Sequence, residues 1–334
     1  KSSKPILYTG GGVINSGPRA TQLLRELVSL TGFPITSTLQ GLGAYPGNDP
    51  QFLGMLGMHG TYEANNAMHD CDLMINVGAR FDDRITGKID EFSPNSKKIH
   101  IDIDPSSINK NVKVDLALVG DVKIVLENLV SAIKKKYPDF DNSNKQKISA
   151  WWGQIENWRK KNSLGFKNSN EIIKPQFAVQ RLYELTKAQD VFITTEVGQH
   201  QMWAAQHYTY CSQNSWISSG GLGTMGFEVP AALGAKVGCP DKMVWSIAGD
   251  GGFQMTLCEL ATIVENNIKV KFALLNNNHL GMITQWQEMF FNEDFYANSY
   301  TANPDFVKLA NAYGMKALSV DNNEDVRPAI REAN

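Results

Sequence analysis

The sequence predicts an α/β protein with two doubly wound domains, each built around a parallel sheet. Short apolar runs alternate with amphipathic segments along most of the chain, which is the pattern of strands joined by crossover helices. Several apolar runs end in glycine, aspartate or asparagine, at the strand ends where parallel sheets bind ligands. With 334 residues, 42% of them hydrophobic, the chain is long enough for two cores.

The first domain is expected over residues 1–136, where apolar runs alternate with helical segments. A helix is predicted over 16–32, with Ser16 as a possible N-cap and Gly32 as the stop signal. A second long amphipathic segment, 122–136, closes the domain. The predicted strands are 5–12, 33–38, 72–78, 97–104 and 116–121.

A polar linker is expected over residues 137–174. Within it, 148–161 carries Ile148, Ile155 and three tryptophans at helical spacing. We interpret this segment as a helix that packs its tryptophans onto a neighbouring domain, because no polar partner supports a functional aromatic site.

The second domain is expected over residues 175–334, again with strands and helices in alternation. Its predicted helices include 224–238 and 256–267. The predicted strands are 191–198, 215–221, 243–250, 270–276 and 315–320.

Composition and charge exclude several classes of function. The net charge of −2 gives no electrostatic basis for binding nucleic acid or an anionic membrane surface. No apolar run reaches the length of a membrane span. The four cysteines lie far apart without a C-x-x-C pair, which favours buried thiols in a reducing compartment, the cytoplasm, over disulfides or a zinc site. The six histidines are scattered, which disfavours a histidine-based metal site.

Two strand ends in the second domain carry the residue types of a metal–phosphate site. Asp250 follows one apolar run, and Asn277 follows the next, 27 residues later. A helix with Leu257, Leu260 and Val264 on one face would join the strands as a right-handed crossover, so both ends would meet at one edge of the sheet. Carboxylate, carboxamide and carbonyl oxygens suit Mg²⁺, which fills its remaining positions with phosphate and water.

Glycines around Asp250 favour a phosphate nearby. Gly249, Gly251 and Gly252 remove side chains where a phosphate would approach the backbone, and the following helix directs its free N–H groups at the anion. Each glycine or asparagine cluster by itself could be an ordinary turn. Both clusters at a strand–helix–strand spacing favour the metal–phosphate interpretation.

This combination of residue type, spacing and context resembles the metal motif of the thiamine-diphosphate enzymes, in which Gly-Asp-Gly is followed by Asn-Asn. Flanking segments narrow the resemblance to the acetohydroxyacid synthase (acetolactate synthase) family, over nearly the whole chain. The matching segments are 197–207, 219–236 and 280–291 for that family's cofactor domain, and 56–65, 78–88 and 99–104 for its flavin-binding middle domain.

The resemblance implies three cofactors, which are thiamine diphosphate, Mg²⁺ and FAD. Asp250 and Asn277 would ligate Mg²⁺ together with the main-chain carbonyl of His279. Met225 would hold thiamine diphosphate in a bent conformation, although a methionine there could also be ordinary core packing. The residues implied around thiamine diphosphate are Val197, Gly198, Gln199, His200, Gly223, Met225, Gly251, Gly252, Gly281 and Met282.

Two further residues have an implied catalytic role, beside Met225 and Met282. Trp286 would shape the pocket for the second 2-ketoacid and favour 2-ketobutyrate over pyruvate, unless it is only a buried aromatic. Arg84, with Asp83, would lie at the entrance to the active site, where a guanidinium could hold a carboxylate. The charged run 80–84 could instead be a solvated turn with internal ion pairs.

The resemblance places FAD at the strand ends of the first domain, with a structural role. The glycine triplet there could let a dinucleotide approach the backbone, although it is not G-x-G-x-x-G. Asp102 could accept a hydrogen bond from a ribose hydroxyl. The implied FAD contacts are Gly10, Gly11, Gly12, Thr38, Leu39, Met58, His59, Gly78, Arg80, Asp102, Ile103, Asp121 and Val122.

Two departures from the family pattern stand out. Glu228 occupies a position where the family usually has glycine or another small residue. Family members also begin with a pyrimidine-binding domain whose glutamate starts the chemistry, and neither Glu196 nor Glu259 matches it. We therefore expect these 334 residues to be part of a longer polypeptide, and by themselves to make no acetolactate.

The implied function is acetolactate synthesis from two pyruvates, or from pyruvate and 2-ketobutyrate, at the start of branched-chain amino-acid biosynthesis. The family implies a homodimer or homotetramer, with a small regulatory subunit as a further partner. One alternative is another thiamine-diphosphate decarboxylase, oxidase or carboligase, such as glyoxylate carboligase, against which 78–84 and 284–287 argue. Another is a non-catalytic flavin module, which would bind FAD without thiamine diphosphate.

Overall fold

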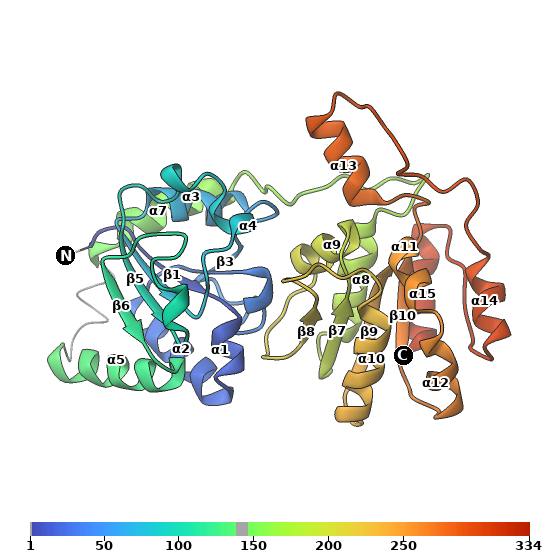
Figure 1. The fold of residues 1–334 in the computed structure, drawn as a ribbon, viewed down its shortest axis with the longest axis horizontal. Helices are drawn as coiled ribbons and strands as arrows, with labels where there is room; N and C mark the ends of the chain where they lie inside the picture. Colours follow the sequence, from blue (N-terminus) through green and yellow to red (C-terminus); the bar gives the residue numbers. More distant parts are fainter. Residues whose placement is uncertain (1, 138–145) are drawn as a thin grey trace. The chain divides into compact units, whose positions relative to one another are not determined.

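The structure is a computed structural model that describes residues 2–137 and 146–334. The chain divides into two compact units, shown in Figure 1. The first contains the residues up to Gly165 together with the short segment Thr209–Asn214, and the second contains Phe166–Tyr208 and Ser215–Asn334. Both units are α/β with parallel sheets, which confirms the predicted fold class.

The first unit has a six-stranded sheet in the order β3-β2-β1-β4-β5-β6, and all its strand pairs are parallel. The chain moves outward from β1 in one direction and then returns to continue on the other side, so the order reverses between β1 and β4. The strands are β1 (Pro5–Thr9), β2 (Ile35–Ser37), β3 (Phe52–Met55), β4 (Leu73–Val77), β5 (Lys97–Asp102) and β6 (Leu116–Val119).

Sequence patterns did not predict β3. It is only four residues long, and Gly54 within it has φ of +87°, so the strand lacks a regular alternation. Its register with β2 also shifts between Ile35 and Ser37. A short, irregular strand at the edge of a sheet leaves little periodicity to detect.

Helices cover both faces of this sheet (Figure 1). Among them α2 packs against α5, and α3 packs against α7. The predicted N-cap of α2 was wrong by one residue, because Ser16 ends α1 and Gly17 precedes Pro18. Gly32 does end the helix in a left-handed conformation, as predicted. The helices are α1 (Gly11–Asn15), α2 (Pro18–Thr31), α3 (Tyr62–Asp70), α4 (Asp83–Thr86), α5 (Val122–Lys136) and α7 (Ser149–Arg159), with 3₁₀ turns η1 (Leu39–Gly41), η2 (Ile89–Glu91) and η3 (Pro105–Ser107).

The tryptophan-rich helix α7 packs onto the first unit. The indole N–H of Trp151 donates to the carbonyl of Pro5 at 3.0 Å, and that of Trp152 donates to the carbonyl of Gly32 at 2.9 Å. Trp151 is almost fully buried. Both polar indole groups therefore have main-chain partners, and the rings contribute to the core of the first unit.

The second unit has a four-stranded sheet in the order β10-β9-β7-β8, also parallel throughout. Its strand order reverses between β7 and β9. The predicted strand at 315–320 was wrong, since no strand forms there in the described chain and Leu318 is exposed. The strands are β7 (Val191–Thr195), β8 (Trp216–Ser218), β9 (Met243–Gly249) and β10 (Lys271–Leu275).

The crossover from β9 to β10 differs from the predicted continuous helix. A helical turn begins at Asp250 itself, a 3₁₀ turn follows, and α12 starts only at Glu259. Its buried face contains Leu260 and Ile263, whereas Val264, predicted to be on that face, is exposed. The helices of this unit are α8 (Pro175–Thr186), α9 (Gln199–His207), α10 (Glu228–Gly238), α11 (Asp250–Phe253), α12 (Glu259–Glu265), α13 (Gly281–Phe290), α14 (Phe306–Ala312) and α15 (Asn323–Ala333), with η4 (Gln254–Thr256).

No helix within residues 2–137 and 146–334 is long and apolar enough to cross a membrane.

Candidate functional site

The reversal between β7 and β9 brings two chain turns together at the carboxyl edge of the second sheet. Residues 196–199 follow β7, and β9 ends at Gly249 and is followed by Asp250. Open α/β sheets bind ligands at such a reversal, because the loops on its two sides turn away from each other and leave a crevice. The residues predicted around a metal and a diphosphate lie at this edge.

Asp250 is hydrogen-bonded to the turn that follows β10. Its carboxylate Oδ2 accepts hydrogen bonds from the backbone N–H of Asn278 at 2.9 Å and from the side chain of Asn303 at 2.7 Å. Asp250 is almost completely buried. Next to it, Asn277 Oδ1 accepts from the backbone N–H of His279 at 3.0 Å. The structure therefore brings Asp250 together with the turn that contains Asn277 and His279.

The oxygen atoms gathered there suit a hard cation that also binds phosphate. The turn offers one carboxylate, asparagine amides and main-chain carbonyls, which match the preference of Mg²⁺. Within the described residues no group of three or more His, Cys, Asp and Glu side chains could hold a metal ion. A site with a single carboxylate therefore fits a metal that completes its shell with phosphate and water better than one held by protein side chains alone.

The glycines around Asp250 make room for neighbouring side chains of the protein. A methyl group on Gly252 would overlap the carboxylate of Glu196, and one on Gly249 would lie 2.7 Å from His200 Nδ1. A methyl group on Gly251 would overlap the hydroxyl of Tyr300. These glycines were predicted to admit a phosphate, and the structure supplies a second steric reason for them.

Three buried ionisable side chains, those of Glu196, His200 and Glu228, lie near this edge. His200 Nε2 lies 2.8 Å from Glu196 Oε1, although the ring N–H is not aligned for a hydrogen bond. Glu196 and Glu228 are both 0% exposed, and no described group donates a hydrogen bond to either carboxyl. Burial, and secondarily the charge of Glu196, raises the pKa of Glu228 to about 8.

The beginnings of α9 and α13 meet at the same edge. A methyl group on Gly281 would overlap Gln199 Oε1 and would lie 3.1 Å from Asn277 Nδ2. Gln199 also donates to Gln285 Oε1 at 3.4 Å. Met282 follows Gly281 in the first turn of α13 and is partly buried.

Three predicted residues on this side make less definite contacts. Met225 and Gly223 lie on the loop between β8 and α10, which Thr256 anchors by donating to the carbonyl of Gly226 at 2.9 Å. Trp286 is partly buried on α13, and its ring centre lies 5.2 Å from that of Phe290. Figure 1 shows α13 beyond the carboxyl edge of the sheet, and its exposed end includes Phe290.

In the first unit, the predicted FAD contacts lie at the carboxyl ends of the parallel strands and in the segments that follow them. The order β3-β2-β1-β4-β5-β6 is the order in which dinucleotides bind at the reversal, here between β1 and β4. The glycine triplet follows β1, and Gly78 follows β4. A methyl group on Gly12 would lie 2.8 Å from the Cα of Gly78, and one on Gly10 would overlap the Gly78 carbonyl. The triplet therefore lets the two turns interlock.

Polar side chains at the other strand ends already have protein partners. Asp102, 7% exposed, accepts from the backbone N–H of Asp104 at 2.9 Å. Asp121 caps α5 and accepts from the hydroxyl of Ser16 at 2.8 Å. Thr38 Oγ1 accepts from the backbone N–H of Gly41 at 3.0 Å. Leu39 and Val122 begin the helical turns that follow β2 and β6, and Ile103 after β5 is exposed.

The charged turn after β4 contains the internal ion pairs that the sequence allowed. Arg80 lies 3.1 Å from Asp82, and Arg84 lies 3.3 Å from Asp83, with all four side chains exposed. The Arg84 carbonyl accepts from the backbone N–H of Met58 at 3.0 Å, so the turn contacts the loop after β3. Burial, and secondarily the charge of Arg84, lowers the pKa of His59.

Comparison with known proteins decides the family. The model of the thiamine pyrophosphate enzyme central domain matches residues 1–129, and that of the thiamine pyrophosphate enzyme C-terminal TPP binding domain matches residues 196–334. The chain belongs to the thiamine pyrophosphate enzymes. The C-terminal match begins at Glu196, where β7 ends, so it includes the whole edge described above.

Curated relatives of the chain include acetolactate synthases. The chain is 44% identical over 331 residues to the acetolactate synthase large subunit of Cyanidium caldarium, covering 99% of this chain and 55% of the relative. It is 42% identical over 332 residues to the acetolactate synthase isozyme 3 large subunit of Escherichia coli (strain K12), covering 99% and 57%. It is 45% identical over 335 residues to the acetolactate synthase of Mycobacterium bovis, covering 99% and 53%. The chain spans about half the length of the curated relatives it matches.

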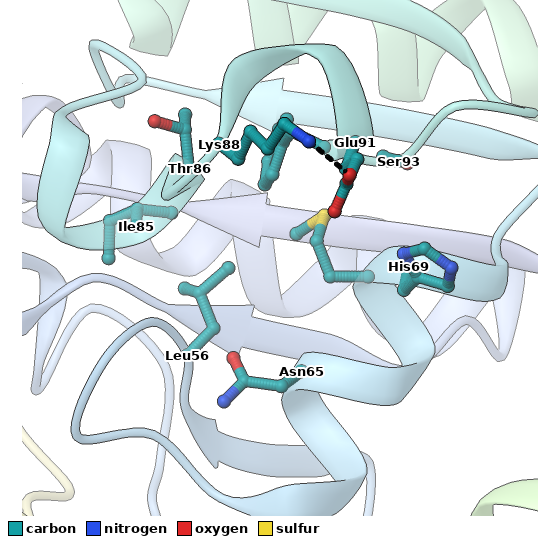
Figure 2. A pocket seen from close by; sticks show the side chains of 10 residues that line it. Leu56, Asn65, His69, Ile85, Thr86, Lys88, Glu91 and Ser93 are labelled. Atoms are coloured by element: carbon teal, nitrogen blue, oxygen red, sulfur yellow. Dashed lines mark hydrogen bonds and ion pairs between the residues drawn. The ribbon is translucent and has the colours of Figure 1, made fainter.

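A pocket of about 250 Å³ in this thiamine pyrophosphate enzyme lies apart from the residues predicted above. Figure 2 shows it in the first unit, with Lys88 and Glu91 paired at 2.6 Å beside Leu56 and Ile85. None of the residues predicted for a cofactor or for catalysis lines it. Lys88 and Glu91 neutralise each other and are exposed, so the pocket offers no evidence of a catalytic site.

Sequence reasoning missed three residues at the edge of the second sheet. Asn303 follows β10 at a long distance along the chain, in an irregular segment, so no spacing identifies it. Glu196 does not match the family's catalytic glutamate, so the sequence assigns it no role at the site. Tyr300 was not considered, although its hydroxyl packs against Gly251. The unusual residue type at Glu228 is the one sequence feature that points to this part of the unit.

Proposed function

We propose that this chain is the flavin-binding and diphosphate-binding part of an acetolactate synthase. The enzyme would convert two pyruvates to 2-acetolactate and CO₂, or pyruvate and 2-ketobutyrate to 2-aceto-2-hydroxybutyrate and CO₂. The observation that carries the proposal is the hydrogen bond from the Asn278 N–H to the Asp250 carboxylate, which joins the two halves of an oxygen-rich turn at the strand reversal. The names of the relatives support the choice of reaction.

Asp250, Asn277 and the carbonyl of His279 would hold Mg²⁺ against the diphosphate of thiamine diphosphate. The buried Asp250 carboxylate is held by two hydrogen bonds, so its orientation is set before a metal binds. Thiamine diphosphate would supply the electron sink for decarboxylation. The residues proposed around it are Val197, Gly198, Gln199, His200, Gly223, Gly251, Gly252 and Gly281.

The protein's own contribution would be to position the cofactor and the two ketoacids. Met225 and Met282 would pack against thiamine diphosphate from the β8–α10 loop and from α13. Trp286 would limit the space for the second ketoacid. Arg84, exposed in the first unit, would bind a ketoacid carboxylate at the entrance, because its planar guanidinium can donate two parallel hydrogen bonds.

FAD would bind across the strand reversal of the first unit, with its diphosphate near the turns after β1 and β4. The strand order and the close approach of Gly12 to Gly78 support this placement. Acetolactate synthesis transfers no net electrons, so FAD would be structural. The residues proposed to contact it are Gly10, Gly11, Gly12, Thr38, Leu39, Met58, His59, Gly78, Arg80, Asp102, Ile103, Asp121 and Val122.

The whole enzyme would work as a homodimer or homotetramer in the cytoplasm, with a small regulatory subunit as a further partner. Relatives named as large subunits support a small subunit. Of the four cysteines, which were predicted to be buried thiols, only Cys71 is buried, and Cys258 is exposed.

Calorimetry on the full-length enzyme tests the proposed cofactor site. Thiamine diphosphate is expected to bind only when Mg²⁺ is present, and Asp250→Ala and Asn277→Ala should each weaken that binding at least tenfold, as loss of a metal ligand or its partner does. Asp241→Ala, a change of an exposed aspartate in the same unit, serves as the control. A non-catalytic flavin module would bind FAD, and none of the three changes would alter its affinity.

A further inference from the structure

Glu228 is the most unusual ionisable group in the second unit. It begins α10 and is 0% exposed. Neither carboxyl oxygen has a hydrogen-bond donor within the described part of the chain. A carboxylate in such a place loses its hydration without compensation, whereas a neutral carboxylic acid loses far less.

The surroundings of Glu228 place it next to the proposed diphosphate edge. Its backbone carbonyl accepts from Thr194 Oγ1 at 3.2 Å, near the end of β7. Two residues further along the chain, directly after β7, Glu196 is also 0% exposed and lies 2.8 Å from His200. The charge of Glu196 acts on Glu228 and disfavours a second carboxylate beside it. Glu196 therefore has a basic neighbour, and Glu228 has an acidic one.

Glu196 and His200 lie against the glycine turn that would receive the diphosphate. Gly252 leaves just enough room for the Glu196 carboxylate, and Gly249 leaves room for the His200 ring. A change in charge at Glu228 would act on Glu196 and, through it, on the backbone on both sides of Asp250.

Other charged groups near α10 do not neutralise Glu228. Helix α10 packs against β7, β8, β9 and α12. Strands β7, β8 and β9 carry no ionisable side chain within their bounds. The titratable groups on these elements and near their carboxyl ends are Glu196, His200, Asp250, Glu259 and Glu265. At the opposite ends lie Asp190, Cys239, Asp241, Lys242 and Cys258, of which Lys242 pairs with Asp190. Lys236 on α10 itself donates to the carbonyls of Pro240 and Lys242.

We propose that Glu228 is a positioning residue of the diphosphate edge, which acts through Glu196 and His200. As the neutral acid it leaves the edge receptive to an anion, and its ionisation adds a buried negative charge that weakens the binding of a magnesium diphosphate. The inference rests on the proposed function, because it assumes that a diphosphate binds there. It adds that this chain's affinity for the diphosphate falls as the solution becomes alkaline.

The test measures the affinity of the full-length enzyme for thiamine diphosphate with excess Mg²⁺, by calorimetry from about pH 6 to about pH 9.5. Wild type is expected to bind roughly five- to tenfold more weakly at about pH 9 than at about pH 7, the effect of one buried charge on an anion nearby. Glu228→Gln should bind as wild type does at pH 7 and lose most of the alkaline weakening. Glu228→Met is a second neutral variant for the case that the amide is not tolerated, and Glu265→Gln, at an exposed position, is the control.

The outcomes separate this inference from the proposed function. Binding that does not weaken with pH in wild type, or an alkaline weakening that persists in Glu228→Gln and Glu228→Met, overturns the inference alone. If no diphosphate binds at any pH, both proposals fail. An infrared difference spectrum of wild type minus Glu228→Gln at neutral pH should also show the carbonyl band of a protonated carboxylic acid, and its absence overturns the inference whatever the binding data show.

Discussion

The backbone N–H of Asn278 donates to the carboxylate of Asp250 across 2.9 Å, and so connects the turn after β10 to the start of α11. The same carboxylate oxygen accepts from the side chain of Asn303 at 2.7 Å. Two donors thus orient a buried carboxylate toward the edge where the strand order reverses. The geometry makes Asn303 a supporting residue of the proposed metal site.

Asn303→Ala should weaken Mg²⁺-dependent thiamine diphosphate binding by roughly tenfold, because loss of a group that orients a metal ligand costs about that much. The change should leave FAD binding unaltered, since Asn303 lies in the second unit. Calorimetry with each cofactor measures both effects, and Asn311→Ala, at an exposed position on α14, is the control. Equal affinities for wild type and Asn303→Ala would show that Asp250 does not need this donor.

Gly252→Ala should destabilise the second unit by about 2 kcal/mol or more, because the new methyl group would overlap the buried Glu196 carboxylate. Gly234→Ala is the matched control, since nothing lies within 4 Å of the added methyl group. It lies within α10 and should stabilise the protein by about 0.5–1 kcal/mol. Denaturant unfolding measures both changes. An unchanged free energy of unfolding in Gly252→Ala would contradict the close packing of Gly252 against Glu196.

The free energy of unfolding should fall with rising pH because of Glu228. Its pKa is about 8 in the folded protein and near 4.5 when unfolded, so the folded state binds more protons between these values. Its stabilising contribution is complete below about pH 4.5 and is lost as the pH rises through about 8. Glu228→Gln should therefore gain stability relative to wild type between about pH 5 and pH 8, by an amount on the order of a few kcal/mol. Denaturant unfolding across that range measures the gain, and parallel curves for the two proteins would refute it.

Trp286→Leu should reduce the preference for 2-ketobutyrate over pyruvate as the second substrate by roughly tenfold, because a pocket distinguishes one methylene by about 1–3 kcal/mol. Competition between the two ketoacids, followed by product analysis, measures the ratio. Phe290→Leu is a control on the same helix, since that ring packs against Trp286 but is exposed. An unchanged ratio in Trp286→Leu would assign Trp286 to packing.

Much of the fold was predictable because parallel strands buried on both faces leave continuous apolar runs with distinctive ends. The runs that end at Asp250 and Asn277 are examples, and the structure brings these turns together. The failures have local causes. Strand β3 is short and contains a glycine with positive φ, and the residues at 315–320 form no strand although their pattern is apolar. The buried face of the helix between β9 and β10 was predicted wrongly at Val264. The helical part of this crossover begins with a turn at Asp250 and is interrupted before α12, so one continuous helical period does not describe it.

The site was less predictable than the fold, because its support comes from residues far apart in the chain. Asn303 reaches Asp250 from 53 residues away, and no spacing rule connects them. The charge of Glu196 acts on Glu228 because β7 and α10 pack together, although the two residues are far apart in the sequence. The glycines near Asp250 could be recognised from sequence, but the side chains that require them could not.

Product analysis with the full-length enzyme tests the proposed synthesis of acetolactate from pyruvate. Incubation with ¹³C-labelled pyruvate, thiamine diphosphate and Mg²⁺, followed by NMR, identifies where the carbon goes. We expect 2-acetolactate and CO₂ in equal amounts, with formation lost in Asp250→Ala. Acetaldehyde or acetate as the main product, or no consumption of pyruvate, would contradict it.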